Sequence, residues 1–150
     1  MRSIVRGAAA GAAGATALNA VTYLDMAVRA RPASSTPQDT VEKASAMAHV
    51  DVPGDGEQRD NRVSALGALT GLATGVAVGA GYGLARGLGF RPPVPAGALV
   101  TAATAMVGAN GPMAALGVSD PRQWGAADWA SDVLPHLAYG LVTAWTAADA

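Results

Sequence analysis

A glycine at every fourth position between residues 67 and 87 constrains the fold of this chain more than any other feature. The series consists of Gly67, Gly71, Gly75, Gly79, Gly83 and Gly87. Positions four apart on a helix lie on one face, so these residues form a groove without side chains, where another backbone can approach closely. Residues 63–85 also carry no charged side chain. The spacing therefore predicts a helix that packs tightly through its glycine face.

The surroundings of this helix indicate a membrane rather than water. In water, each interior glycine destabilises a helix by about 0.5–1 kcal/mol relative to alanine. In hydrocarbon, an unpaired peptide group costs several kcal/mol, so such a segment stays helical whatever its intrinsic propensity. The composition agrees, because 14% of the residues are charged and 51% are hydrophobic, whereas soluble domains average about 25% charged.

Four charge-free runs can each cross a bilayer, at residues 7–24, 63–85, 92–119 and 133–148. About 20 residues are needed to span the hydrocarbon, and the short fourth run can be extended through Asp128, as an N-cap, and Trp129, as an interfacial anchor. We therefore expect an all-α fold, namely a four-helix transmembrane bundle in one domain, residues 1–150. The expected spans are about residues 5–27, 62–87, 94–117 and 129–148.

The long polar loop at residues 28–61 carries a helix signal of its own. Thr36 is the expected N-cap and Pro37 the first helical residue, with Met47 on an apolar side further along. This pattern predicts a short amphipathic helix at the membrane surface. In the third span, Asn110 and Gly111 precede Pro112, and we expect this triplet to break or kink the helix.

Polar residues gather by depth at one end of the expected bundle. If the four spans alternate in direction, the polar loop at residues 28–61 and the loop at residues 119–131 share one side of the membrane. The candidate polar cluster near that side consists of Asn19, Tyr23, Asp25, Asn110, Asp132, His136 and Tyr139. On the last span, one helical stripe is formed by Asp128, Asp132, His136, Tyr139 and Thr143.

Three interpretations of that stripe remain open. Its polar groups can simply hydrogen-bond between helices. Alternatively, they can line a small pocket in which Asp132 orients the imidazole of His136 as a proton acceptor or ligand-binding group. The third option is a metal site that uses His49, His136 and nearby carboxylates, but the spacing is not diagnostic, so we expect no metal and no cofactor. His136 is expected to face the interior, and Asp25 is expected to pair with Arg29 at the surface.

The packing partner of the glycine face is expected within the same chain. Gly7, Gly11 and Ala15 are also four apart, so the first span can present a second smooth face. The alternatives are a homo-oligomer or another membrane protein that docks on the glycine groove, in addition to the lipid bilayer itself.

The functional signals of the sequence are sparse. The net charge of −1 gives no reason to expect nucleic acid, and there are no cysteines for disulfides or thiol chemistry. Phosphate loops, zinc-protease motifs and nucleophile elbows are missing from the sequence. The leading expectation is a non-enzymatic integral membrane protein for packing, assembly or partner binding. A small transporter or proton-coupled binding protein that uses the polar cluster is second, and a membrane enzyme with a lipid-like substrate is third.

Three segments carry a resemblance to known proteins. They are residues 17–26 (ALNAVTYLDM), 110–113 (NGPM) and 128–140 (DWASDVLPHLAYG). These segments resemble parts of uncharacterised small multi-spanning membrane proteins from high-GC bacteria, which are similar in outline to the YagU-type inner-membrane proteins. The resemblance implies a multi-pass protein of the bacterial plasma membrane, and it transfers no catalytic residue.

Overall fold

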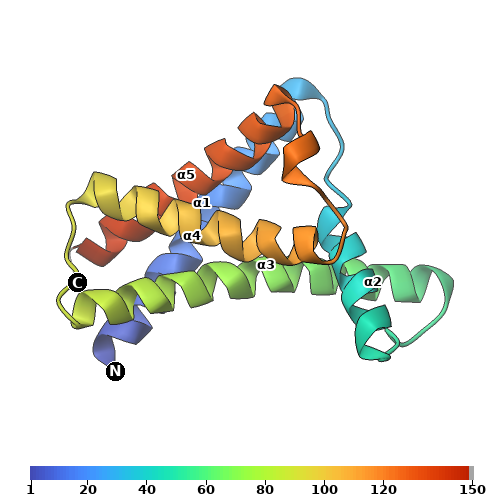
Figure 1. The fold of residues 1–150 in the computed structure, drawn as a ribbon, viewed down its shortest axis with the longest axis horizontal. Coiled ribbons are helices and arrows are strands. Elements are labelled where there is room, and N and C mark those ends of the chain that lie inside the picture. The colour runs from blue at the N-terminus through green and yellow to red at the C-terminus, as the bar shows by residue number, and fades with distance from the viewer. Residues whose placement is uncertain (149–150) are drawn as a thin grey trace.

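A computed structural model describes residues 1–148, and all regular structure in this range is helical. The elements are α1 (Arg2–Arg29), α2 (Thr36–Ala48), α3 (Gly56–Gly87), α4 (Val94–Ala115), the 3-10 turn η1 (Pro121–Gln123) and α5 (Ala126–Ala148) (Figure 1). The all-α expectation is therefore confirmed, and a short helix does occupy the first loop.

The four long helices alternate in direction and define two ends of the molecule. The N-terminus, the end of α5 and the loop from α3 to α4 lie at one end, which we call the N-terminal end (Figure 1). There, Arg86 Nη2 donates to the carbonyl of Ala148 at 3.4 Å. At the opposite end, which we call the α2 end, Arg29 Nη2 donates to Ser131 Oγ at 2.7 Å. The two polar loops are thus on the same side of the bundle.

The crossing of α1 and α3 is built from glycine on both helices. A β-carbon placed on Gly79 would lie 2.5 Å from Gly11 Cα, and one placed on Gly7 would lie 2.7 Å from Gly83 Cα. Ala15 continues this contact, since its Cβ lies 3.2 Å from the position of a β-carbon on Gly75. The helices therefore touch backbone to backbone, which maximises van der Waals contact between them. The residues of α1 at this crossing are those expected from their spacing.

The rest of the glycine series has other neighbours. Gly67 faces Pro37 of α2, with 3.1 Å between the position of its missing β-carbon and the Pro37 ring. Gly87 faces Ser3, whose Oγ lies 2.6 Å from the corresponding position. Within residues 1–148, no atom lies within 4 Å of the β-carbon position of Gly71. The glycine series of α3 thus contacts both α2 and α1, and Gly71, between these two contacts, is uncovered.

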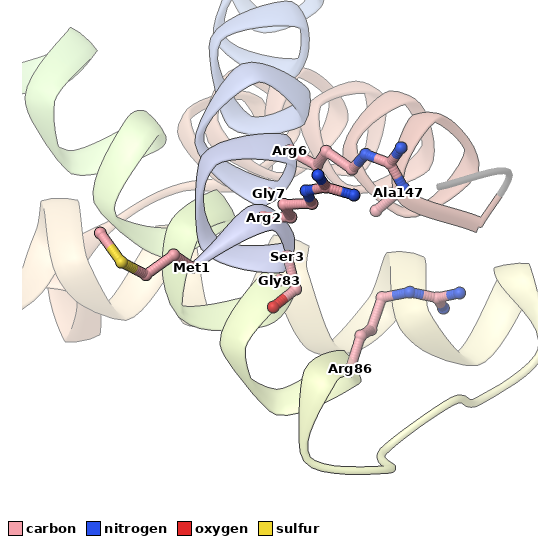
Figure 2. A pocket seen from close by; sticks show the side chains of 8 residues that line it. All are labelled: Met1, Arg2, Ser3, Arg6, Gly7, Gly83, Arg86 and Ala147. Atoms are coloured by element: carbon pink, nitrogen blue, oxygen red, sulfur yellow. The ribbon is translucent and has the colours of Figure 1, made fainter.

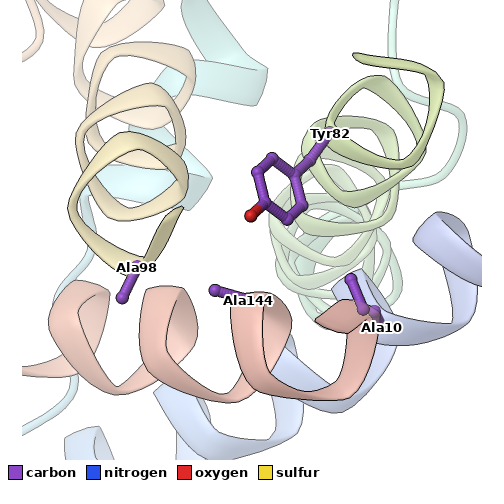
Figure 3. Packing of buried hydrophobic residues seen from close by; sticks show 5 residues of the cluster. Ala10, Tyr82, Ala98 and Ala144 are labelled. Carbon is purple, nitrogen blue, oxygen red and sulfur yellow. The ribbon is translucent and has the colours of Figure 1, made fainter. Parts of the chain in front are cut away.

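The interior of the bundle is made mostly of small side chains, with the rings of Tyr82 and Tyr139 among them. Its apolar cluster consists of Ala10, Tyr82, Ala98, Ala144 and Ala147 (Figure 3). The contact of α4 with α5 follows the same rule, because a β-carbon on Gly140 would lie 2.8 Å from that of Ala102. No leucine of residues 1–148 is buried, and Leu69, Leu99 and Leu141 are each more than half exposed. Large apolar side chains therefore cover the outside of the molecule.

One helix of the described chain, α3, is long and apolar enough by length and composition to cross a membrane. Only 22% of its most apolar 18-residue window is buried within the protein. The other long helices, α1, α4 and α5, contain small and polar residues and are less apolar over such a length.

Two helix starts differ from the expectation. Ser35, not Thr36, is the N-cap of α2, and its Oγ donates to Asp39 Oδ2 at 3.0 Å. Helix α5 begins at Ala126, so Asp128 lies inside the first turn instead of before it. There its Oδ2 accepts a hydrogen bond from the backbone N–H of Gly125 at 3.0 Å, as the acidic member of a capping box does.

Helix α4 continues through Pro112 to Ala115, so of the break or kink expected at residues 110–112 the break is wrong. A proline removes one backbone donor and one hydrogen bond to the residue four positions earlier. That cost is small here, because Pro112 lies in the last turn of the helix. The helix then ends where the Pro112 carbonyl accepts from the Leu116 N–H at 2.9 Å.

Candidate functional site

An open cleft of about 620 Å³ lies at the α2 end of the bundle, where the ends of α1 and α4 meet the starts of α2 and α5. We call it the polar cleft. Its polar lining includes Asn19, Tyr23, Arg29, Asn110, Ser131 and Asp132. The alternating helix directions bring these residues together, although they are far apart in the sequence. Four of them, Asn19, Tyr23, Asn110 and Asp132, belong to the polar cluster expected from the sequence.

A chain of polar contacts connects α4 to α5 at the wall of the cleft. Asn110 Nδ2 donates to Asp132 Oδ2 at 2.8 Å. The other carboxylate oxygen of Asp132 lies 3.4 Å from His136 Nδ1, which also lies 2.7 Å from the backbone carbonyl of Asp132. A neutral imidazole that donates from Nδ1 carries its acceptor lone pair on Nε2. Asp132 therefore fixes the ring orientation of His136, as proposed for the pocket interpretation.

His136 itself is not part of the cleft lining. The residue is 8% exposed and faces the interior of the bundle, as expected, behind Asp132. A ligand in the cleft meets Asp132 and Asn110 first. The arrangement therefore presents hydrogen-bonding groups to a ligand and keeps the imidazole out of direct reach.

A network of ion pairs and hydrogen bonds lies at the rim of the cleft. Asp25 pairs with Arg29 at 3.0 Å, as expected, and also with Arg31 at 2.6 Å. Ser131 of α5 accepts from Arg29 at 2.7 Å and donates to Asp25 Oδ2 at 3.4 Å. The C-terminal end of α1 is thereby tied to the first turns of α5. Asp25 lies outside the cleft lining and acts on the site through the two arginines.

The deeper half of the polar stripe on α5 serves helix packing. Tyr139 is fully buried, and its hydroxyl donates to the carbonyl of Gly75 at 2.7 Å. Thr143 Oγ1, one turn further, lies 3.5 Å from the carbonyl of Ala10. Tyr139 therefore lies apart from the polar cleft, and it connects α5 to α3 at the point where α1 also packs against them.

The two histidines lie in unrelated places. His49 is the exposed C-cap of α2, where Nδ1 lies 3.0 Å from the carbonyl of Ala46, whereas His136 is buried in α5. In residues 1–148, no three His, Asp or Glu side chains come together in a way that could hold a metal ion.

Sequence reasoning missed Arg29, Arg31 and Ser131 as parts of the site. Arg29 was assigned to an exposed pair with Asp25, and its second partner, Ser131, follows it by about a hundred residues. The sequence did offer one signal for this contact. If both polar loops lie on the same side of the bundle, the last turn of α1 and the first turns of α5 lie close together.

The polar cleft combines guanidinium and amide donors with two carboxylates, those of Asp128 and Asp132. The Ser131 hydroxyl accepts from Arg29 and donates to the Asp25 carboxylate. The arrangement suits binding of a small polar group. No protein-family model, curated protein or solved structure matches this chain.

Proposed function

We propose that this chain is a multi-pass protein of the bacterial plasma membrane that acts without catalysis, as an assembly or partner-binding component. Its four spans are about residues 5–27, 62–87, 94–117 and 129–148. One observation carries the proposal, namely the arrangement of small residues inside and large apolar residues outside. The resemblance of residues 17–26, 110–113 and 128–140 to bacterial membrane proteins supports the compartment.

The distribution of side chains is unfavourable for a protein surrounded by water. Burying a leucine side chain stabilises a soluble fold by about 1.5–3 kcal/mol, and this chain leaves its leucines at the surface. In a bilayer that gain is irrelevant, because lipid tails are as apolar as leucine. Helices then associate through close van der Waals contact, which Gly and Ala permit and which the crossing of α1 with α3 displays.

The two ends of the bundle also suit membrane interfaces. Trp124 and Trp129 pack edge to face at the α2 end, with ring centroids 5.1 Å apart, and Trp129 is 41% exposed. Tryptophan is enriched at the level of lipid headgroups. Helix α2 has no buried residue, and Met47 is 71% exposed, so its apolar side remains available to a membrane surface.

The role in assembly is supported by an uncovered part of α3. All residues from 68 to 73 are exposed, and Gly71 has no neighbour within 4 Å of its β-carbon position among the described residues. This segment lies in the middle of a charge-free run, where lipid or another helix is the available neighbour. A glycine at its centre permits close approach of a second helix.

Single-cysteine labelling tests the four-span topology directly, because the natural chain has no cysteine. The variants Met47→Cys, Arg91→Cys and Gln123→Cys place one thiol in each connecting segment. With a membrane-impermeant maleimide on intact cells and on inverted vesicles, we expect positions 47 and 123 to react from the same side and position 91 from the opposite side.

Each alternative topology gives a different labelling pattern. If only α3 crosses the membrane, positions 91 and 123 react from one side and position 47 from the other. If the protein does not enter the membrane, all three positions react in the soluble fraction without a barrier. Either pattern would overturn the four-span proposal.

A second candidate function is the binding of a small polar ligand in the polar cleft. The observation that favours it is Asp132, whose carboxylate faces the cleft with Asn110 and His136 as its partners. A panel of primary amines in a thermal-shift assay tests it, because an ammonium group complements this carboxylate. Asp132→Asn should remove any amine-dependent shift, whereas Asp51→Asn, an exposed control, should keep it.

A further inference from the structure

A second cleft, of about 470 Å³, lies at the N-terminal end of the bundle (Figure 2). It is bordered by the first turns of α1, the last turns of α3 and the end of α5. The charged side chains that line it are Arg2, Arg6 and Arg86. We call it the arginine cleft.

The helix crossing explains why three arginines meet there. Arg2 and Arg6 are four apart and therefore lie on one face of α1. Arg86 follows Gly83 by three positions on α3, and Gly83 is the residue that touches Gly7 of α1. In Figure 2, the side chains of Arg2, Arg6 and Arg86 extend to the same side of the view, while Met1 points away. Close contact between the two backbones thus concentrates positive charge in one opening.

The arginines at this end differ from most of those at the α2 end in their partners. Arg29, Arg31, Arg59 and Arg122 each pair with a carboxylate, whereas Arg62 donates to the Pro53 carbonyl. Among residues 1–148, no carboxylate pairs with Arg2, Arg6 or Arg86. Arg86 donates to the Ala148 carbonyl and lies over the ring of Tyr82, 5.8 Å from its centroid. Three guanidinium groups around one cleft repel each other unless an anion lies between them.

We propose that the arginine cleft binds a phosphate group, such as an anionic phospholipid headgroup or free phosphate presents. Guanidinium groups donate in a planar fork that matches phosphate oxygens, and three of them offer more donors than the described residues use. The cleft contains no described carboxylate that would compete for the site. The lipid source rests on the membrane placement proposed above, because the cleft then lies at headgroup level, whereas the phosphate chemistry does not depend on it.

The test uses the full chain, so Asp149, which follows α5 in the sequence, is present in every arm. Thermal unfolding is measured in mild detergent with increasing inorganic phosphate, with chloride at matched ionic strength as the reference. The same measurement is made in phosphatidylcholine nanodiscs with and without phosphatidylglycerol. The variants are Arg6→Gln and Arg86→Gln, with Arg91→Gln as the control, because Arg91 is exposed near the same end but outside the cleft lining.

We expect saturable stabilisation whose half-maximal concentration rises at least fivefold in Arg6→Gln and in Arg86→Gln, but less than twofold in Arg91→Gln. Stabilisation by phosphatidylglycerol with little effect of phosphate identifies a lipid headgroup, and the reverse identifies free phosphate. Equal responses in all three variants, or none beyond that to chloride, would overturn the site. Because the labelling test of topology is independent, a negative result here leaves the membrane proposal standing.

Discussion

At the scale of single residues, Gly79 shows how little space the bundle leaves between its helices. A β-carbon there would lie 2.5 Å from Gly11 Cα and 2.6 Å from Gly11 N, both backbone atoms that cannot move without moving α1. Gly81, two residues further along the same helix, is exposed and has no neighbour within 4 Å among the described residues. The same residue type therefore has opposite roles at these two positions.

The first prediction compares one methyl group at both places. Gly79→Ala should destabilise the protein by about 1–3 kcal/mol or more, because overpacking pushes α1 away from α3. Gly81→Ala should be neutral or stabilise by up to about 1 kcal/mol, through the better helix propensity of alanine. Unfolding titrations in mixed detergent micelles measure both. Equal stability of the two variants would show that α1 and α3 do not cross at these glycines.

At the scale of elements, a two-point ion pair fastens α2 to α3. Arg59 Nη1 and Nη2 donate to the two carboxylate oxygens of Glu42 at 2.5 and 2.6 Å. The hydrogen bond from Arg59 holds the pKa of Glu42 below its usual range. A carboxylate whose pKa is lowered by folding stabilises the fold at neutral pH and loses that contribution as the pH falls through the folded pKa.

We therefore predict that α2 loosens in acid before its neighbours do. Amide protection factors in α2 should fall a few-fold as the pH falls through the lowered folded pKa of Glu42, where the carboxylate takes up a proton. The loop around η1 should persist to lower pH, because hydrogen bonds from Arg122 lower the pKa of Asp120 to about 2. Hydrogen exchange measured by mass spectrometry reports both regions.

Glu42→Gln is the matched control for this pH dependence. The variant cannot titrate at position 42, so protection in α2 should already be reduced at pH 7 and then stay level across the acidic range. If the wild-type protein and Glu42→Gln lose protection in parallel, a different group controls the attachment of α2.

At the scale of the whole molecule, the sequence predicted the helices and their order better than it predicted the functional surface. Helical spacing placed Gly7 and Gly11 opposite the glycines of α3, because a smooth face can be read from period four alone. Helix ends were less predictable, because each depends on local hydrogen bonds. The Pro112 carbonyl accepts one at the end of α4, and the Asp128 carboxylate accepts one at the start of α5.

Long-range side-chain contacts were the least predictable feature of the sites. The polar cleft depends on the contact of Arg29 with Ser131. The arginine cleft depends on the contact of Gly7 with Gly83, which brings Arg86 near Arg6. The contact of Arg29 with Ser131 leaves no periodic signal in the sequence, and the glycine spacing alone does not fix which glycine of α3 meets Gly7. The expected depth of Asn110 and Asp132, in contrast, was enough to place these two residues at the same end.

The last prediction concerns self-association through the uncovered part of α3. Gly71→Leu should abolish an oligomer in mild detergent while the monomer remains folded, because a side chain at position 71 meets no described neighbour within the chain. Gly81→Leu makes the same change at another open position and should leave the oligomer intact. Light scattering coupled to size-exclusion chromatography measures both. An oligomer that survives Gly71→Leu and dissociates in Gly81→Leu would assign the contact to another face.

Helices α1 and α3 cross near the start of α1, so a rotation of α1 about this crossing moves its far end the most. Beyond Gly11, α1 continues to Arg29 and rises away from α3 toward the α2 end, fastened to α5 by Ser131 (Figure 1). At about 1.5 Å per residue this segment is about 27 Å long, so each degree of rotation at the crossing moves its tip by about 0.5 Å. A small change in the angle at these glycines is therefore expected to alter the width of the polar cleft at the opposite end of the molecule.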